Sequence, residues 1–368
     1  MNGINKIKEM NVGLFGEQPL IVSSDLPISK LIGVLKEENA YEAFILKEDK
    51  VGIASIREIL KSPNVNSKVS SITTFIPKVS SETKVSEAAK LMDEYRIRAL
   101  PIFNGNKLTK TVKASSILKA SLKESWSLPV SKLINLPLTS IQKGSSITKA
   151  RKLMVENEID HLPVLESNSL IGVLTSTRIV FHLFPTKASK RDELMKEALK
   201  KSHFPVESLM DEPFSVEINE DAYFTLEKIM DRKLDYALIT LWSEVQGIIT
   251  FRDYMKLFYE SKKEIENLPV YIIGLPNDFL SSELIKLKFA KAVNNLMKVY
   301  PDLMEARANI KTLKKGRYEV DVNINTSRKL ISFKEVGWDL TAIFNNISKR
   351  LKRALTQKKV KRKYKGEA

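Results

Sequence analysis

The stretch EIDHLPVLESNSLIGVLTSTRI, residues 158–179, decides how most of this chain folds. Its apolar runs LPVL and LIGVL favour strands, and the polar ESNS between them favours a turn, so the stretch predicts an antiparallel hairpin. Ahead of it, SITKARKLMVEN (146–157) has apolar residues at helical spacing, and a second helix follows the hairpin. The stretch therefore predicts a unit of helix, strand, turn, strand and helix.

The same unit occurs four times in the first 260 residues. The second strand and closing helix of each copy align without gaps as VGIASIREIL (51–60), TKTVKASSIL (109–118), IGVLTSTRIV (171–180) and QGIITFRDYM (246–255). The first strands are AFIL, LPIF, LPVL and ALIT. Four copies in register make a chance similarity among αβ segments improbable, so the chain is read as a repeat protein.

This unit resembles the CBS domain, a β-α-β-β-α module that pairs into a Bateman module, and the arrangement resembles archaeal proteins with four CBS repeats. The resemblance is clearest in the quoted stretch and in MDRKLDYALITLWSEVQGIITFRDY (230–254). It implies an α/β and α+β fold in which residues 10–120 form one module and residues 127–260 form the other. The insertion PTKASKRDELMKEALKKSHF (185–204) predicts an extra helix.

The resemblance also implies a nucleotide site. In the family, a Gly-x-x-[Ser/Thr]-x-x-Asp pattern contacts ribose, because a carboxylate can accept bonds from both ribose hydroxyls. The fourth repeat keeps the whole pattern as Gly247, Thr250 and Asp253, whereas the third keeps only Gly172 and Thr175. Basic residues before the first strand often meet phosphate, and Arg98 and His161 lie in about that place.

We therefore expect an adenine nucleotide (ATP, ADP or AMP) as a regulatory ligand rather than a required cofactor. Two plainer interpretations stay open. Thr250 and Asp253 could simply cap the closing helix of the fourth repeat. The repeats could also act as a dimerisation scaffold without ligand, which we favour for the first two.

Charge separates the end of the chain from the rest. From Leu268 onward there are 22 Lys and Arg residues against 9 Asp and Glu, a net charge of +13, whereas residues 1–267 carry only +3. Such an asymmetry between two parts of a chain indicates a nucleic acid or another anionic surface as partner for the basic part.

The basic part predicts a second domain over residues 268–356, followed by a basic tail at 357–368. VYIIGL is a strand, residues 279–300 have a helical apolar face, three alternating strands follow, and a last helix starts near Asp339. This β-α-β-β-β-α order predicts two helices on one face of a small sheet. The order, and the final helix with Arg350-Leu351-Lys352-Arg353 and KKVKRKYK, resemble the hibernation-promoting and ribosome-associated inhibitor family.

The resemblance implies that this domain binds the small ribosomal subunit through its cations. Lys and Arg residues at the hairpin turns and along the helices would contact RNA phosphates, which gives salt-dependent binding without sequence readout. The candidates are Lys286, Lys291, Lys314, Lys315, Arg317, Arg328, Lys329, Lys349, Arg350, Lys352, Arg353, Lys358, Lys359, Lys361, Arg362 and Lys363. For residues 356–368 taken alone, a solvated, disordered end is the favoured interpretation.

The sequence therefore predicts a non-enzymatic factor that holds ribosomes idle, with the repeats sensing nucleotides or promoting dimers. No nucleophile motif or phosphate loop stands in the chain, and it has no Cys and no paired His spacing for a metal. No apolar run approaches a membrane span and no secretory signal is evident, so we expect a cytoplasmic protein and no membrane partner. A ligand-responsive DNA-binding regulator is the alternative, although no helix-turn-helix pair is evident after Leu268.

Overall fold

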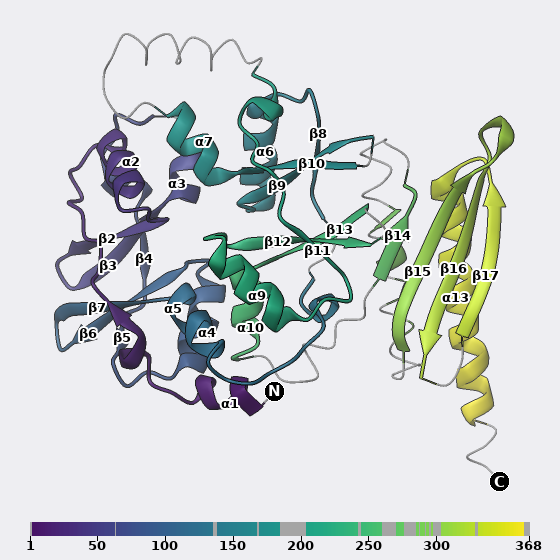
Figure 1. Ribbon diagram of the computed structural model, residues 1–368, viewed down its shortest axis with the longest axis horizontal. Coiled ribbons are helices and arrows are strands. Elements are labelled where there is room, and N and C mark those ends of the chain that lie inside the picture. The colour runs from purple at the N-terminus through teal and green to yellow at the C-terminus, as the bar shows by residue number, and fades with distance from the viewer. Residues whose placement is uncertain are drawn as a thin grey trace.

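The computed structural model describes most of the chain. The described residues are 2–62, 64–134, 138–167, 169–184, 204–241, 244–259, 270–275, 285–286, 288–290, 292–293, 296, 303–327 and 330–363. Two parts lie side by side in Figure 1: the repeat body, residues 2–259, and the carboxy-terminal domain, residues 270–363.

Each repeat contains the predicted helix, hairpin and closing helix. In the first two repeats these are α2 (Ile28–Glu37), β2 (Glu42–Lys47), β3 (Lys50–Ser55), α3 (Ile56–Lys61), and then α4 (Val85–Glu94), β6 (Ala99–Asn104), β7 (Lys107–Lys113), α5 (Ala114–Ser121). In the last two they are α6 (Ile147–Asn157), β9 (His161–Glu166), β10 (Ser169–Thr175), α7 (Ser176–Leu183), and then α9 (Ala222–Asp231), β12 (Tyr236–Leu241), β13 (Glu244–Thr250), α10 (Phe251–Lys256).

Short strands complete the sheets around these hairpins. β5 (Val79–Ser80), β8 (Ile141–Gln142) and β11 (Ser215–Glu217) each pair in parallel with the first strand of their own repeat. At the amino end, α1 (Asn2–Lys8) precedes β1 (Gly16–Glu17), which extends the sheet of the second repeat, and β4 (Thr74–Ile76) extends that of the first. The predicted β-α-β-β-α order is confirmed.

Neighbouring repeats pair through their strands. The third and fourth repeats share one six-stranded sheet, of order β11-β12-β13-β10-β9-β8. The first and second have separate sheets joined by an apolar cluster that includes Phe44, Ile53, Ile76 and Phe103. The body therefore consists of two modules, as the sequence predicts.

Helices join the two modules in a pattern that the sequence did not reveal. One core cluster combines the first repeat with the third, and another combines the second with the fourth and with α1. Accordingly α3 packs against α7, and α10 packs against α4 and α5. Because apolar helix faces from both modules close these cores, the four repeats surround a common centre (Figure 1).

The carboxy-terminal domain has the expected β-α-β-β-β-α order. Its sheet has the order β14 (Val270–Ile273), β15 (Leu303–Thr312), β16 (Tyr318–Thr326), β17 (Leu330–Gly337), with β14 parallel to β15 and the others antiparallel. Alternate residues such as Val320, Val322 and Ile324 are buried against α13 (Leu340–Lys363), which lies along one face of the sheet (Figure 1). Phe289, in the partly described helix between β14 and β15, meets Phe344 edge-on at 5.7 Å.

Strand β14 belongs to both parts of the molecule. Because successive side chains of a strand point to opposite faces, Val270 and Ile272 pack in the carboxy-terminal core while Tyr271 is buried in the core of the body. The backbone N–H of Gly274 also donates to both carboxylate oxygens of Glu244 on β13, at 3.2 and 3.0 Å. The domain is therefore attached to the body through a packed strand.

Several expectations fall on other residues. The insertion helix at 185–203 and the candidates Lys291, Arg328 and Lys329 lie outside the described residues. The disordered end favoured for 356–368 is not what the structure shows over its first part, because α13 is helical to Lys363. Within the described ranges, no helix is both long and apolar enough to cross a membrane.

Candidate functional site

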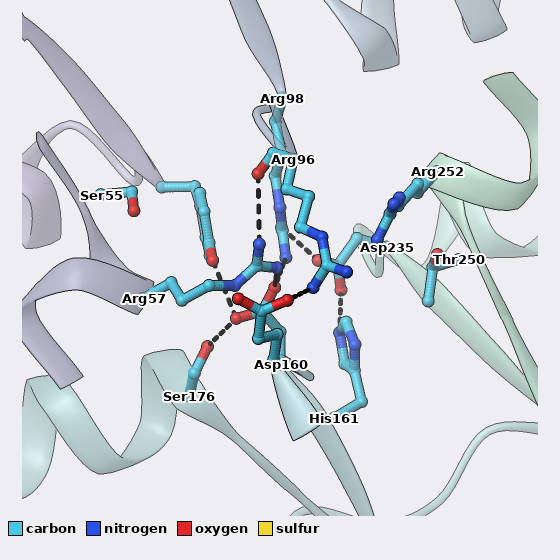
Figure 2. Close-up of polar contacts among 12 residues, drawn as sticks. Ser55, Arg57, Arg96, Arg98, Asp160, His161, Ser176, Asp235, Thr250 and Arg252 are labelled. Carbon is cyan, nitrogen blue, oxygen red and sulfur yellow. Dashed lines mark hydrogen bonds and ion pairs between the residues drawn. The ribbon is translucent and has the colours of Figure 1, made fainter. Parts of the chain in front are cut away.

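A cavity of about 360 Å³ lies where the four repeats meet. Its lining comes from all four repeats and includes Arg57, Arg98, Asp160, Asp235 and residues of α10. This volume is near the lower end of the range of about 300–1,000 Å³ that is typical of small-molecule sites. The centre of the body is therefore the candidate site (Figure 2).

The repeated architecture places one equivalent residue from each repeat at this centre. Each opening helix is followed by a residue with positive φ, namely Asn39, Arg96, Glu158 and Lys233. Two positions later, a backbone carbonyl accepts the N–H of the first residue of the closing helix, in the pairs Tyr41–Ile56, Arg98–Ala114, Asp160–Ser176 and Asp235–Phe251. The shared backbone geometry explains why Tyr41, Arg98, Asp160 and Asp235 converge.

Asp160 is buried among donors from the first and third repeats. Its carboxylate pairs with the Arg57 guanidinium, accepts the Tyr41 hydroxyl at 2.8 Å and accepts the Ser176 hydroxyl at 3.0 Å. Arg98 lies 3.5 Å away. Burial acts to raise the pKa of Asp160, but Arg57 and Arg98 outweigh it and the pKa is lowered. The carboxylate is therefore held charged.

Asp235 has the corresponding role in the fourth repeat. It pairs with the Arg98 guanidinium and lies 2.9 Å from Nε2 of His161 (Figure 2). Burial again acts to raise the pKa, whereas Arg98 and His161 lower it further, so the pKa of Asp235 lies well below its usual range. The Arg98 guanidinium also stacks over the Tyr41 ring at 3.6 Å. Arg98 is thus held on three sides.

Two further ion pairs lie at the edge of the cavity. Arg96 pairs with Glu158, which joins the turns of the second and third repeats. Arg252 pairs with Asp93, which also accepts the Tyr259 hydroxyl at 2.6 Å. Together with Lys256 and Asp253, whose charged atoms are 3.3 Å apart, the described lining has five Lys and Arg residues and five Asp and Glu residues, all ion-paired.

Glu42 is a buried carboxyl beside this cluster. Its Oε1 accepts the backbone N–H of Arg98 at 2.9 Å, while Oε2 has no hydrogen-bond partner among the described atoms. Burial raises the pKa of Glu42 to about 7, against the opposing charge of Arg98. This group therefore carries its proton up to near-neutral pH.

The other side of the cavity combines an apolar wall with a helix start. Leu138, Ile159 and Ile248 supply apolar surface that can contact a flat base. At the N-terminus of α10, the backbone N–H and the hydroxyl of Thr250 both donate to Oδ2 of Asp253, each at 2.9 Å. The helix-capping interpretation of this pair is therefore confirmed, and the pair also lines the cavity.

The structure brings together four of the seven predicted nucleotide residues: Arg98, His161, Thr250 and Asp253. Gly247 is buried one residue from the lining, and Thr175 caps α7 by accepting the N–H of Arg178 at 3.1 Å. Neither Gly172 nor Thr175 is among the described lining residues. Gly172 instead lies so close to Met210 that a Cβ would overlap its Sδ, so Gly172 has a packing role.

The prediction that Arg98 and His161 occupy matching positions is wrong by one residue. The residue equivalent to Arg98 is Asp160, and His161 follows it. The sequence analysis did not identify Arg57, Asp160 and Asp235. The signal that could have found Asp160 and Asp235 is their constant offset from the end of each opening helix.

The predicted RNA-binding cations form two separate groups. Lys314, Lys315 and Arg317 are exposed on the β15–β16 turn, where the Arg317 guanidinium lies 5.6 Å from the ring of Trp338, which is 64% exposed. The second group lies on α13, whose far end is opposite this turn (Figure 1). Lys349 is exposed, but Arg350 pairs with Glu335 at 2.8 Å.

The remaining candidates are placed only by their backbone. Lys286 lies in the partly described helix, and the others lie along the last turns of α13 at Lys352, Arg353, Lys358, Lys359, Lys361, Arg362 and Lys363.

Comparison with known families agrees with this architecture. Residues 69–123 and 130–184, which correspond to the second and third repeats, match the CBS domain family. The body is built from CBS repeats that form two Bateman modules. The family match thus includes the second repeat, in which Lys110 replaces the expected glycine.

Relatives of this chain occur among archaea. An uncharacterised protein of Methanocaldococcus jannaschii is 25% identical over 253 residues, which cover 66% of this chain and 60% of the relative. An inosine-5'-monophosphate dehydrogenase of Korarchaeum cryptofilum is 34% identical over 113 residues, which cover 30% of this chain and 23% of the dehydrogenase. The chain thus spans less than two thirds of both relatives.

Among solved structures, a second Methanocaldococcus jannaschii protein, proposed to be an archaeal homologue of g-AMPK, has a similar fold. It superposes with a TM-score of 0.61 at 17% identity and covers 68% of this chain and 100% of that protein. At this level of identity the similarity establishes the fold of the CBS body.

Proposed function

We propose that this chain is a non-enzymatic regulator in which the CBS body binds an adenine nucleotide or a related adenosine ligand in the central cavity. The observation that supports this most directly is the cavity itself. It combines the Thr250–Asp253 pair with an apolar wall and with guanidinium groups from several repeats. A base, a ribose and a polar substituent could each find a matching surface there.

The carboxy-terminal domain would then act on RNA. Its exposed turn carries Lys314, Lys315 and Arg317 beside Trp338, a combination that suits phosphates and an unpaired base. Following the resemblance of its element order and last helix, we propose small-subunit rRNA as the target and an idle ribosome as the outcome. The packing of β14 against both parts supports a connection between ligand binding and this domain.

The ligand-binding part can be tested at the helix caps. Thr250→Ala and Thr175→Ala each remove an N-cap hydroxyl of a closing helix, at a cost of about 1 kcal/mol in stability. Only Thr250 lines the cavity. Calorimetry with adenosine and AMP should show at least about fivefold weaker binding in Thr250→Ala, which is about 1 kcal/mol, and unchanged binding in Thr175→Ala. Equal losses in both variants would contradict this site.

The RNA-binding part can be tested by co-sedimentation with small ribosomal subunits at rising salt. The full chain should pellet with the subunits at low salt and be released steeply as salt increases, because phosphate contacts release counterions. Duplex DNA should compete poorly if structured RNA is the target. Efficient competition by duplex DNA would instead support a DNA-binding regulator.

A further inference from the structure

The charge balance of the cavity carries an inference about its ligand. This inference rests on the proposed adenosine site. We infer that the cavity accepts an adenosine-type ligand without a polyphosphate chain, and that Asp160 and Asp235 exclude di- and triphosphates by occupying the guanidinium groups that such a chain would need.

The first step is the position of the two carboxylates. Asp160 and Asp235 come from the third and fourth repeats and reach Arg57 and Arg98 of the first and second (Figure 2). Guanidinium groups are the donors that would bind phosphate oxygens in such a site. In this chain those donors already have carboxylate partners, which are supplied by the protein itself.

The second step is the burial of these pairs. The side chain of Asp160 is 7% exposed and that of Arg57 is 14% exposed. A phosphate that took the Arg57 guanidinium would leave Asp160 close to new negative charge in a poorly solvated place. An uncompensated buried charge is strongly unfavourable. The Tyr41 and Ser176 hydroxyls also donate to Asp160, so its side chain is held in place.

The third step is the rest of the lining. The other described cations, Arg96, Arg252 and Lys256, are likewise ion-paired, with Glu158, Asp93 and Asp253. The described lining therefore has no net charge apart from any on His161, and it offers a polyanion no attractive field. An uncharged ligand needs no ion pair to open. It can use the apolar wall and the polar groups of Thr250.

The experiment is calorimetry of the full chain with adenosine, AMP and ATP in a buffer with EDTA, so that no metal ion shields the phosphates. We expect adenosine to bind at least about tenfold more tightly than ATP, with AMP between them, which corresponds to about 1.4 kcal/mol. Asp235→Asn, which keeps the shape but frees Arg98 of a charged partner, should improve ATP binding about tenfold and change adenosine binding less than about twofold.

Asp211→Asn is the matched control. It removes an ion pair with Arg178 whose side chains are 42% and 39% exposed, and neither residue is among the described lining. Its ligand preferences should equal those of the wild type. If wild-type protein binds ATP more tightly than adenosine, the exclusion is wrong while the proposed site stands, and this result needs no variant to fold. If neither compound binds, the proposed site fails and the inference with it.

Discussion

The CBS body and the carboxy-terminal domain treat charge in opposite ways. In the body, cations are buried at the centre and paired across large sequence separations, as in Arg57 with Asp160 and Arg98 with Asp235. In the carboxy-terminal domain, Lys334 reaches Glu319 and Asp321 on the neighbouring strand, and its side chain is 51% exposed. Charge in the body therefore serves assembly and ligand choice, whereas charge in the domain remains available to a partner.

The strongest way to break this comparison is to remove one buried cation. Arg57→Ala leaves Asp160 buried without its main partner, and we expect the body to lose about 3–5 kcal/mol of its free energy of unfolding. Urea titration followed by circular dichroism measures this loss. Lys334→Ala, which opens an exposed pair, should leave the free energy of unfolding nearly unchanged.

If both variants lost the same amount, the buried pairs would not differ from surface pairs, and the comparison between the two regions would fail. A small loss in Arg57→Ala alone would mean that Arg98, at 3.5 Å, replaces Arg57 as the partner of Asp160.

The pH dependence of stability sharpens the same contrast within the body. The pKa of Glu42 is raised to about 7 from 4.5, so between these values the folded protein keeps a proton that the unfolded chain releases. Stability should therefore fall by about 3 kcal/mol as pH rises from about 4.5 to about 7, and stay level above that range. Thermal unfolding across this range measures the effect.

Glu42→Gln is the test of that assignment. The amide retains an oxygen for the Arg98 N–H but cannot ionise, so the variant should lack the decline and be about 3 kcal/mol more stable at pH 8. Asp160 and Asp235 act in the opposite direction, because their lowered pKa values give stability that is present above about pH 4 and lost only at more acid pH. A decline that survives in Glu42→Gln would assign it to another group.

The two regions also differ in how far the sequence could predict them. Strands, helices and the β-α-β-β-β-α order followed from local periodicity, because alternating burial in β16 or apolar spacing in α6 is a property of the segment itself. The Thr250–Asp253 cap was equally local.

The ion pairs at the centre could not be found in this way. Arg57 meets Asp160 only because α3 packs against α7, and that contact depends on how two modules are placed relative to each other. Arg98 was predicted as a phosphate contact because its repeat was considered by itself. Its actual partner, Asp235, comes from the other module. Pairing between distant repeats is a property of the assembly.

The smallest expected effect concerns the exposed turn of the carboxy-terminal domain. Lys314 and Lys315 are exposed, and no ion pair engages them within the residues that the structure describes. Lys314→Ala with Lys315→Ala should leave the free energy of unfolding and adenosine binding unchanged. The double variant should weaken binding to small ribosomal subunits only several-fold, and it should reduce the slope of log affinity against log salt by about 1–2, because two phosphate contacts are lost.

The matched control places the same two changes on the body, at Lys149 and Lys152 of α6, which are also exposed. If the cations of the carboxy-terminal domain are the ones that face RNA, Lys149→Ala with Lys152→Ala should keep the wild-type salt slope although it removes the same formal charge. An equal fall in slope for both double variants would show that net charge alone attracts the RNA. A fall confined to Lys314 and Lys315 would locate the contact at the β15–β16 turn, because two proteins of equal net charge differ there only in where the cations stand.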